Sequence, residues 1–280
     1  MSRIYQNQII LAGADRYRRG VHYHNNTIAL AKKLGASLQM IYVVDLWDLK
    51  VSHHGFNPYG PCPGPFLVRG TAREKSLIAE GREELRKFEA ACESASIKHS
   101  GEVVVGVPEI LWAQNVRSCE LFMVFPHEKD FGCFGNIFWK IAARSCRPVL
   151  ILRQDGLLGN RMILFYSGRA ESARALPRVK EICFALGTSL TVYISKRGSR
   201  RYAHDECQAF LHHHHISVTF KDRNVLDVLE SEVKHPGSEI EKPSLLVFDS
   251  GFYRGFWFGK YRHFVNQLIR KSYHNILLCP

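Results

Sequence analysis

Four consecutive histidines, His212–His215, close a predicted helix and are the side chains of this sequence best suited to bind a metal ion. Imidazole is a common zinc ligand, but a site needs three or four ligands that converge on one point. Successive helical residues point about 100° apart, so two of these rings at most can share an ion. His204 or Cys207 would have to complete the set. An evolved site, adventitious affinity and a merely polar helix end all stay open; we predict no dedicated metal site.

Catalytic motifs are absent from the sequence. It contains no G-x-S-x-G, G-x4-G-K-[S/T] or H-E-x-x-H pattern, so neither a nucleophilic serine, a P-loop nor a zinc protease site is indicated. Ser167-Gly168-Arg169 matches a pyrophosphatase SGG loop only in part. We interpret Asp48 and the pair Asp227 and Glu230 as residues of solvated loop or helix faces. The prediction is a protein without catalytic residues, which is not an enzyme.

The composition is that of an ordinary globular protein. Of 280 residues, 46% are hydrophobic and 23% are charged. No apolar run reaches the roughly 18–20 residues of a membrane span, and the N-terminus lacks a signal-peptide core. The eight cysteines form no CxxC pair, which is typical of free thiols in a reducing compartment. We therefore predict a cytoplasmic protein that does not associate with membranes.

The formal charge of +12 has two interpretations. It is either a general surface charge or the mark of a dedicated polyanion site. Local clusters occur only at Arg16–Arg19 and Lys196–Arg201, and neither is interleaved with aromatic residues as in base-stacking surfaces. We predict no specific nucleic-acid motif; proteins or a small molecule are the expected partners.

A segment of the chain occurs twice. Ala31–Ile41 is echoed by Cys183–Tyr193, with Leu, Gly, Ser and Leu in the same places 152 residues apart. The same spacing superimposes Ile10–Asp15 on Met162–Ser167, which are both apolar runs that end in a small polar residue. Such repetition indicates two copies of one fold in a single chain.

Short apolar runs alternate with segments of helical period in both copies, which favours a parallel α/β sheet. The expected strands lie near 8–14, 37–44, 101–105, 120–125, 148–152, 161–166, 189–194, 216–220, 244–248 and 275–279. The expected helices lie near 21–34, 71–95, 108–117, 136–145, 171–186, 203–214, 224–234 and 261–272. The predicted fold is two tandem doubly wound, Rossmann-like domains, each with a five-stranded parallel sheet.

We predict domain boundaries at 1–152 and 161–280, with 153–160 as the linker. The second copy is shorter, chiefly because it lacks the Pro- and Gly-rich stretch 53–70, which is either a mobile excursion or a functional loop. The last strand of each copy is apolar and would be a liability on an open sheet edge. We expect these strands to pair with each other in an intramolecular pseudo-dimer, and further homodimerisation stays open.

These features together resemble the universal stress protein family. The resemblance is carried by Asp15 after the first strand, by the ending Ala31-x-x-Leu34-Gly35-Ala36-x-Leu38, by Val103–Leu111 (similar to V-x-x-G-x-P-x-x-x-I), and by Arg144–Leu152 (similar to A-x-C-P-V-L-V-V). It spans nearly the whole chain and is closer in the first copy. It implies tandem α/β domains and a stress-response or regulatory role.

The resemblance also implies a ligand site in the first copy. Family members that bind ATP carry an Asp after the first strand and the pattern G-x2-G-x9-G-[S/T] after the fourth, because glycines let backbone N–H groups approach phosphates. Asp15 matches the Asp, Val44 the adenine contact and Gly106 the ribose-side turn. The remaining candidates are Gly132, Gly135 and Asn136, where Asn136 replaces the Ser or Thr.

The phosphate pattern is broken in both copies. If Gly135 is the third glycine, Phe122 and Phe125 stand at the first two positions. In the second copy the pattern positions hold Asp249, Phe252 and Arg262-His263, while Ser167 replaces the Asp and Lys221 replaces the ribose-side glycine. The expectation is a non-enzymatic regulatory binding protein without a cofactor. The alternative is an adenine-nucleotide switch that uses the first copy only, with AMP or adenosine preferred to ATP.

Overall fold

The computed structural model describes residues 8–50, 72–127, 137–153, 161–194, 200–213, 216–221, 223–235, 237, 240, 244–252 and 259–280. The stretch 53–70 and the residues Gly132, Gly135 and Asn136 lie outside this set. Among the described residues, no helix is long and apolar enough to cross a membrane.

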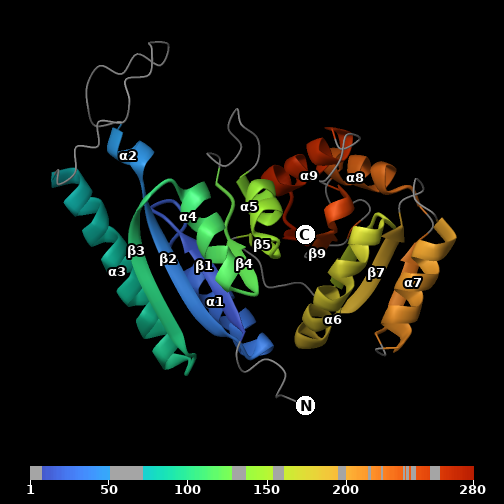
Figure 1. The fold of residues 1–280 in the computed structure, drawn as a ribbon, viewed down its shortest axis with the longest axis horizontal. Coiled ribbons are helices and arrows are strands. Elements are labelled where there is room, and N and C mark those ends of the chain that lie inside the picture. Colours follow the sequence, from blue (N-terminus) through green and yellow to red (C-terminus); the bar gives the residue numbers. More distant parts are fainter. Residues whose placement is uncertain are drawn as a thin grey trace, which may run out of the picture.

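The first half of the chain alternates strands and helices (Figure 1). Its elements are β1 (Ile9–Ala14), α1 (Val21–Leu34), β2 (Ser37–Asp45), α2 (Leu46–Lys50), α3 (Ala72–Ser94), β3 (His99–Gly106), α4 (Pro108–Asn115), β4 (Leu121–Val124), α5 (Ile137–Ser145) and β5 (Val149–Ile151).

The second half follows the same order. It comprises β6 (Arg161–Tyr166), the 3-10 turn η3 (Ala170–Arg174), α6 (Ala175–Leu186), β7 (Ser189–Ile194), α7 (Arg200–His213), β8 (Val218–Lys221), α8 (Val225–Lys234), β9 (Leu245–Phe248), α9 (Gly259–Lys271) and β10 (Asn275–Leu278).

All ten strands form one sheet in the order β3-β2-β1-β4-β5-β10-β9-β6-β7-β8. Pairing is parallel within each half, and β5 pairs antiparallel with β10 where the halves meet. The expected pairing of the two final strands is therefore confirmed. Counterpart strands of the two halves lie at equal distances from the junction, so a pseudo-two-fold axis passes through it. The carboxyl ends of the parallel strands therefore point in opposite directions in the two halves.

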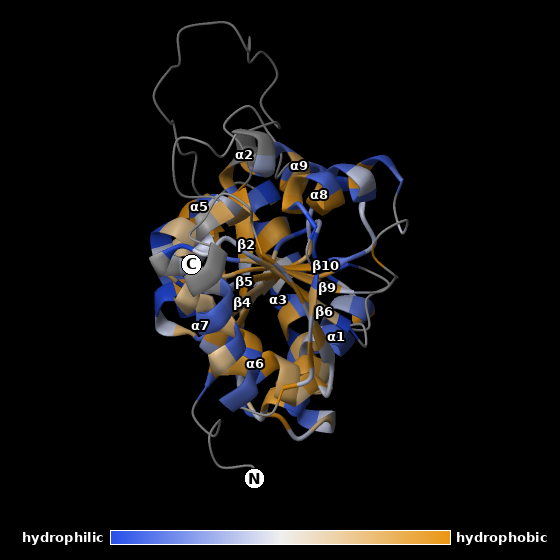
Figure 2. Cartoon of the chain, turned by 90° about the vertical axis from the view of Figure 1, so that its right-hand side faces the viewer, coloured by the Kyte–Doolittle hydropathy of each residue, from blue (hydrophilic) through white to orange (hydrophobic). Residues whose placement is uncertain are grey.

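Two hydrophobic cores cover the two faces of the sheet. Residues of α1, α3, α6 and α7 pack on one face, and residues of α4, α5, α8 and α9 pack on the other. Figure 2 shows the apolar strands at the centre with helices on both sides. The doubly wound arrangement predicted from the alternation of elements is thus present.

The repeated sequence segment has a local structural cause. Gly35 ends α1 and Gly187 ends α6, both with φ 62°. This left-handed conformation lets the glycine N–H bond back to the last turn, and an L side chain there would be strained. Each glycine therefore ends its helix and is followed by the next strand, at equivalent positions in the two halves.

Several details differ from the sequence expectations. A five-residue helix, α2, follows β2; it was not predicted because five residues are too few to show a helical period. The first turn expected of α6 is the 3-10 turn η3. β8 begins at Val218 rather than at 216.

Candidate ligand site

Asp15, Val44 and Gly106 lie at one edge of the sheet. Asp15 directly follows β1, Val44 is the penultimate residue of β2, and Gly106 ends β3. The register pairs Val44 with Val105, and β2 lies between β1 and β3. The three predicted residues therefore meet at the carboxyl ends of neighbouring parallel strands, where α/β proteins place ligands.

The carboxylate of Asp15 is engaged by its own segment of chain. Its Oδ1 atom accepts the N–H groups of Tyr17 (2.8 Å) and Arg18 (2.9 Å). Its Oδ2 atom forms an ion pair with Nη1 of Arg18. Asp15 and Arg18 are each only 4% exposed. The negative charge at this edge is thus matched by a cation three residues along the chain.

Arg18 is fixed by contacts other than Asp15. Its Nε donates to the carbonyl oxygen of Phe125 at 2.7 Å, which ties the β1 segment to the chain after β4. Its guanidinium carbon lies 5.1 Å from the ring centre of Trp112, a fully buried residue of α4. A guanidinium over an aromatic face gains cation–π attraction. These contacts with Phe125 and Trp112 fix the Arg18 side chain at the carboxyl end of β1.

Bulky side chains fill the space beneath Asp15. A Cβ atom added to Gly13 would lie 2.6 Å from Cζ of Phe122 and 3.2 Å from the ring of Trp112. On the other side of the sheet, the Tyr23 hydroxyl donates to the carbonyl of Gly13 at 3.0 Å. Glycine at position 13 is required by this close approach.

Gly106 is also explained by packing. A Cβ at this position would lie 2.6 Å from Cδ1 of Leu111 in α4. The missing side chain makes room for α4 to approach the end of β3. The resemblance predicted that the missing side chain of Gly106 leaves space for a ribose. In the structure, the position of that missing side chain faces Leu111.

Asp48 corrects an expectation. It is only 8% exposed, and its Oδ1 accepts the hydroxyl of Tyr17 at 2.9 Å. The Tyr17 ring also stacks on His127 at 4.6 Å. Asp48 is therefore a buried hydrogen-bond partner of Tyr17, and not the solvated loop residue that we expected. Asp227 and Glu230 do lie on an exposed helix face, where they bond Asn224 and Lys234.

The equivalent edge of the second half is closed differently. Asp249, which follows β9, is fully buried, and its Oδ2 accepts the N–H of Ser167 at 2.6 Å. A series of ring contacts extends from it: Phe165 on Phe248 (4.9 Å), Phe248 on Phe252 (6.1 Å) and Phe252 on Tyr261 (5.1 Å). Phe252 is only 1% exposed. Aromatic side chains thus take up the space at this edge.

Strand register overturns one predicted equivalence. Lys221 pairs with Tyr193, and Tyr193 corresponds to Ile41, which pairs with Glu102. Lys221 is therefore level with Glu102, four residues before Gly106. Sequence spacing alone misplaced it because β8 is only four residues long.

The histidine run does not form a metal site within the described residues. Of the run, His212 and His213 are described, and no group of three His, Cys, Asp or Glu that could hold an ion occurs in the described part of the chain. Cys207 is fully buried, and this burial raises the pKa of its thiol to about 12.

Sequence reasoning missed Arg18, the residue that defines this edge. Its signal was present: Arg16–Arg19 was noted as a basic cluster, and Arg18 follows Asp15 at a spacing that permits a turn. Trp112 was missed as well, because a tryptophan on an apolar helix carries no specific signal for its partner.

The architecture is that of the universal stress proteins. A universal stress protein from Archaeoglobus fulgidus has a similar structure over 98% of this chain and 97% of its own, with a TM-score of 0.72 and 15% identity. A putative universal stress protein from Pseudomonas aeruginosa UCBPP-PA14 covers 97% and 92%, with a TM-score of 0.58 and 12% identity.

A protein of unknown function from Pseudomonas aeruginosa PAO1 is similar over 97% of this chain and 92% of its own, with a TM-score of 0.56 and 11% identity. No protein-family model matches the sequence. No curated protein matches it either. The similarity therefore lies in the fold.

Proposed function

We propose that this chain is a non-enzymatic regulatory binding protein of the universal stress class whose two nucleotide-type edges are closed by its own side chains. The observation that carries the proposal is the buried contact between Asp15 and Arg18. A ligand hydroxyl or amine that bonded Oδ2 of Asp15 would have to displace a guanidinium held by two further contacts, with Phe125 and with Trp112.

The second half supports the same proposal. Asp249 is satisfied by a backbone N–H, and Phe252 is buried against Tyr261. The carboxylates that follow β1 and β9, those of Asp15 and Asp249, both bond groups of the protein itself. The activity left to such a scaffold is to bind a protein or another small molecule.

The alternative is an adenine-nucleotide switch confined to the first half. It is supported by the presence of Asp15, Val44 and Gly106 at adjoining strand ends, whereas Ser167 stands at the position of Asp15 in the second half. In that case Arg18 would have to turn away from Asp15 and pair with a phosphate.

Isothermal titration calorimetry with ATP or AMP, with and without Mg²⁺, separates the two proposals. We expect no saturable heat that depends on Asp15. Saturable one-site binding that Asp15→Asn abolishes would contradict the closed-edge proposal and support the switch. Glu83→Gln, on an exposed part of α3, is the matched control because it removes one carboxylate away from the edge.

A further inference from the structure

A cavity of about 240 Å³ lies where the two halves meet, away from Asp15. Three of its lining residues are arginines: Arg147 precedes β5, Arg174 ends η3, and Arg178 lies in the first turn of α6. The first belongs to one half and the other two to the second. The walls between them are formed by Pro148, Pro177 and Pro280.

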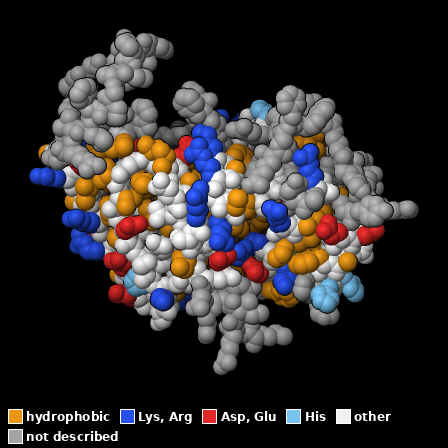
Figure 3. Space-filling view, in the orientation of Figure 1, with side chains coloured by type: hydrophobic (Ala, Val, Ile, Leu, Met, Phe, Trp, Pro, Cys, Tyr) orange, Lys and Arg blue, Asp and Glu red, His pale blue; other side chains and the backbone are white. Residues whose placement is uncertain are grey.

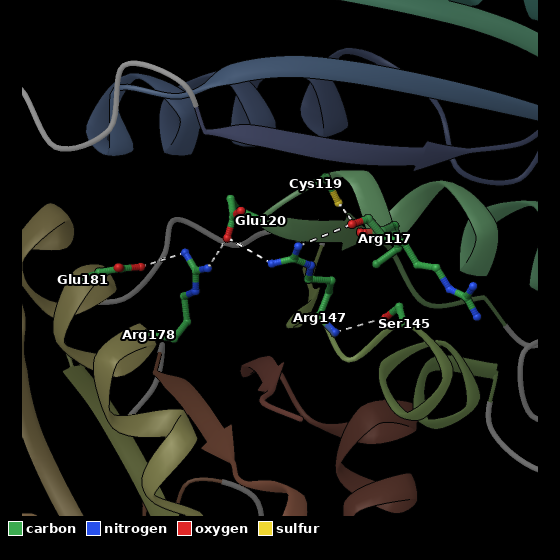
Figure 4. A network of polar contacts seen from close by, with 8 residues as sticks. Arg117, Cys119, Glu120, Ser145, Arg147, Arg178 and Glu181 are labelled. Carbon is green, nitrogen blue, oxygen red and sulfur yellow. Dashed lines mark hydrogen bonds and ion pairs between the residues drawn. The ribbon is translucent and has the colours of Figure 1, made fainter.

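Two of these guanidiniums converge on a single oxygen atom. Oε2 of Glu120 accepts Nη1 of Arg147 at 3.4 Å and Nη2 of Arg178 at 2.9 Å, as the dashed lines in Figure 4 show. Nη1 of Arg178 also lies 2.7 Å from Glu181, and Nη2 of Arg147 donates to the carbonyl of Arg117. The arginines are therefore held in place from both halves.

The cavity keeps an excess of positive charge. Its lining includes three arginines and one acidic side chain, Glu181, which is paired with Arg178. Glu120 pairs with Arg147 and Arg178, so the unmatched charge is that of Arg174. Arg174 has neither a hydrogen bond nor an ion pair with its side chain in the described part of the chain. Figure 3 shows Lys and Arg side chains gathered along the middle of this face, where the halves meet.

The pseudo-two-fold offers an internal comparison. At the opposite end of the β5–β10 ladder, Arg153 is the counterpart of Pro280, and Asn26 is the counterpart of Arg178. Arg153 donates from Nη2 to the carbonyl of Leu268 at 3.2 Å, and its N–H bonds Asn275 at 2.9 Å. Burial lowers its pKa to about 10. Arg153 thus bonds the second half directly, whereas its counterpart Pro280 lines the cavity.

We propose that this cavity binds the phosphate group of a small phosphorylated molecule. Guanidinium groups donate paired N–H groups that match phosphate oxygens, and several arginines can bind one tetrahedral dianion from different sides. The volume lies below the roughly 300–1,000 Å³ of pockets for drug-sized ligands, which favours a small ligand. The prolines offer no N–H donors, so the arginines provide the recognition.

Arg174 provides the sharpest test because its side chain makes no hydrogen bond or ion pair in the described part of the chain. We expect inorganic phosphate to give saturable binding by NMR titration at constant ionic strength, and Arg174→Gln to weaken it at least tenfold. Arg82→Gln removes an identical charge from the exposed face of α3 and should leave binding unchanged. Phosphate should also slow labelling of the exposed Cys146, which lines the cavity.

The outcomes separate a site from diffuse charge. Equal weakening by Arg174→Gln and Arg82→Gln, or no saturation by phosphate, would overturn the proposal. Tighter binding of succinate than of phosphate, lost in Arg174→Gln, would overturn the assignment of phosphate. The cavity includes neither Asp15 nor Val44, so the double variant Asp15→Asn with Arg18→Met, which leaves no buried charge unmatched, should leave this binding intact, which keeps the test independent of the nucleotide experiment.

Discussion

Leu150 of β5 and Leu277 of β10 lie opposite each other in the antiparallel ladder that joins the halves. The two are also counterparts, because the final strands superimpose at a spacing of 127 residues. The turns before both strands agree with this spacing: Ser145 accepts the N–H of Arg147, and Ser272 accepts that of His274. The pseudo-two-fold axis therefore passes between these two leucines.

This symmetry predicts equal costs for Leu150→Ala and Leu277→Ala. Both leucines are at most 1% exposed, so each truncation should lower the free energy of unfolding by about 2–5 kcal/mol. Urea unfolding measures the loss, and Ile110→Ala on an exposed part of α4 is the control. A large loss at one leucine and none at the other would contradict the symmetric junction.

Glu84 predicts a pH dependence of stability. Its Oε1 accepts the N–H of Gly20 at 2.6 Å and lies 3.1 Å from Nε2 of His24, which joins α3 to α1. The contact with His24 is the largest cause that lowers the pKa of Glu84. A carboxyl whose folded pKa is depressed contributes stability above its unfolded pKa of about 4.3, and this contribution is lost as pH falls through the folded pKa.

The measurement is the slope of unfolding free energy against pH from about pH 6 down to about pH 3, a range that crosses the unfolded pKa. Glu84→Gln should flatten this slope and lower stability at neutral pH. Glu83→Gln, whose carboxylate is 48% exposed beside Arg86, should change neither markedly. An identical slope in Glu84→Gln and the wild type would sink this assignment.

Cys146 is predicted to be the reactive thiol among the described cysteines. It is exposed, whereas Cys92, Cys119, Cys183, Cys207 and Cys279 are buried. Burial raises the pKa of these five thiols to about 11 or 12, so little thiolate forms at neutral pH. A thiol reagent should label one site rapidly in a protein with Cys62 and Cys133 replaced by serine. Rapid labelling that survives Cys146→Ser would contradict this.

Most of the fold could be predicted from the sequence because local signals agreed with one another. The repeated Leu-Gly-x-Ser-Leu segments mark the helix ends at Gly35 and Gly187, and the apolar runs mark buried strands. The α1 bounds, 21–34, match the expectation fully. Helix α2 was missed because five residues are too few for a periodic pattern.

The candidate site was predicted less well, because its chemistry depends on contacts between distant residues. Asp15 and Gly106 were found from family-like spacing, but their partners Arg18 and Leu111 were not. The contact of Arg18 with Phe125 spans 107 positions and depends on the pairing of β1 with β4. Only the folded sheet brings these groups together.

Arg18 should be required for stability as the counter-ion of Asp15. Removing one partner of a buried ion pair leaves an unmatched charge and typically costs about 3–5 kcal/mol, whereas replacing both by neutral groups costs far less. Arg18→Met should therefore destabilise the protein strongly, and Asp15→Asn combined with Arg18→Met should restore much of the loss. A double-mutant cycle in urea measures this coupling; additive losses would mean that the two buried groups do not act as a pair. Arg82→Met is the control, since Arg82 lies on an exposed helix face.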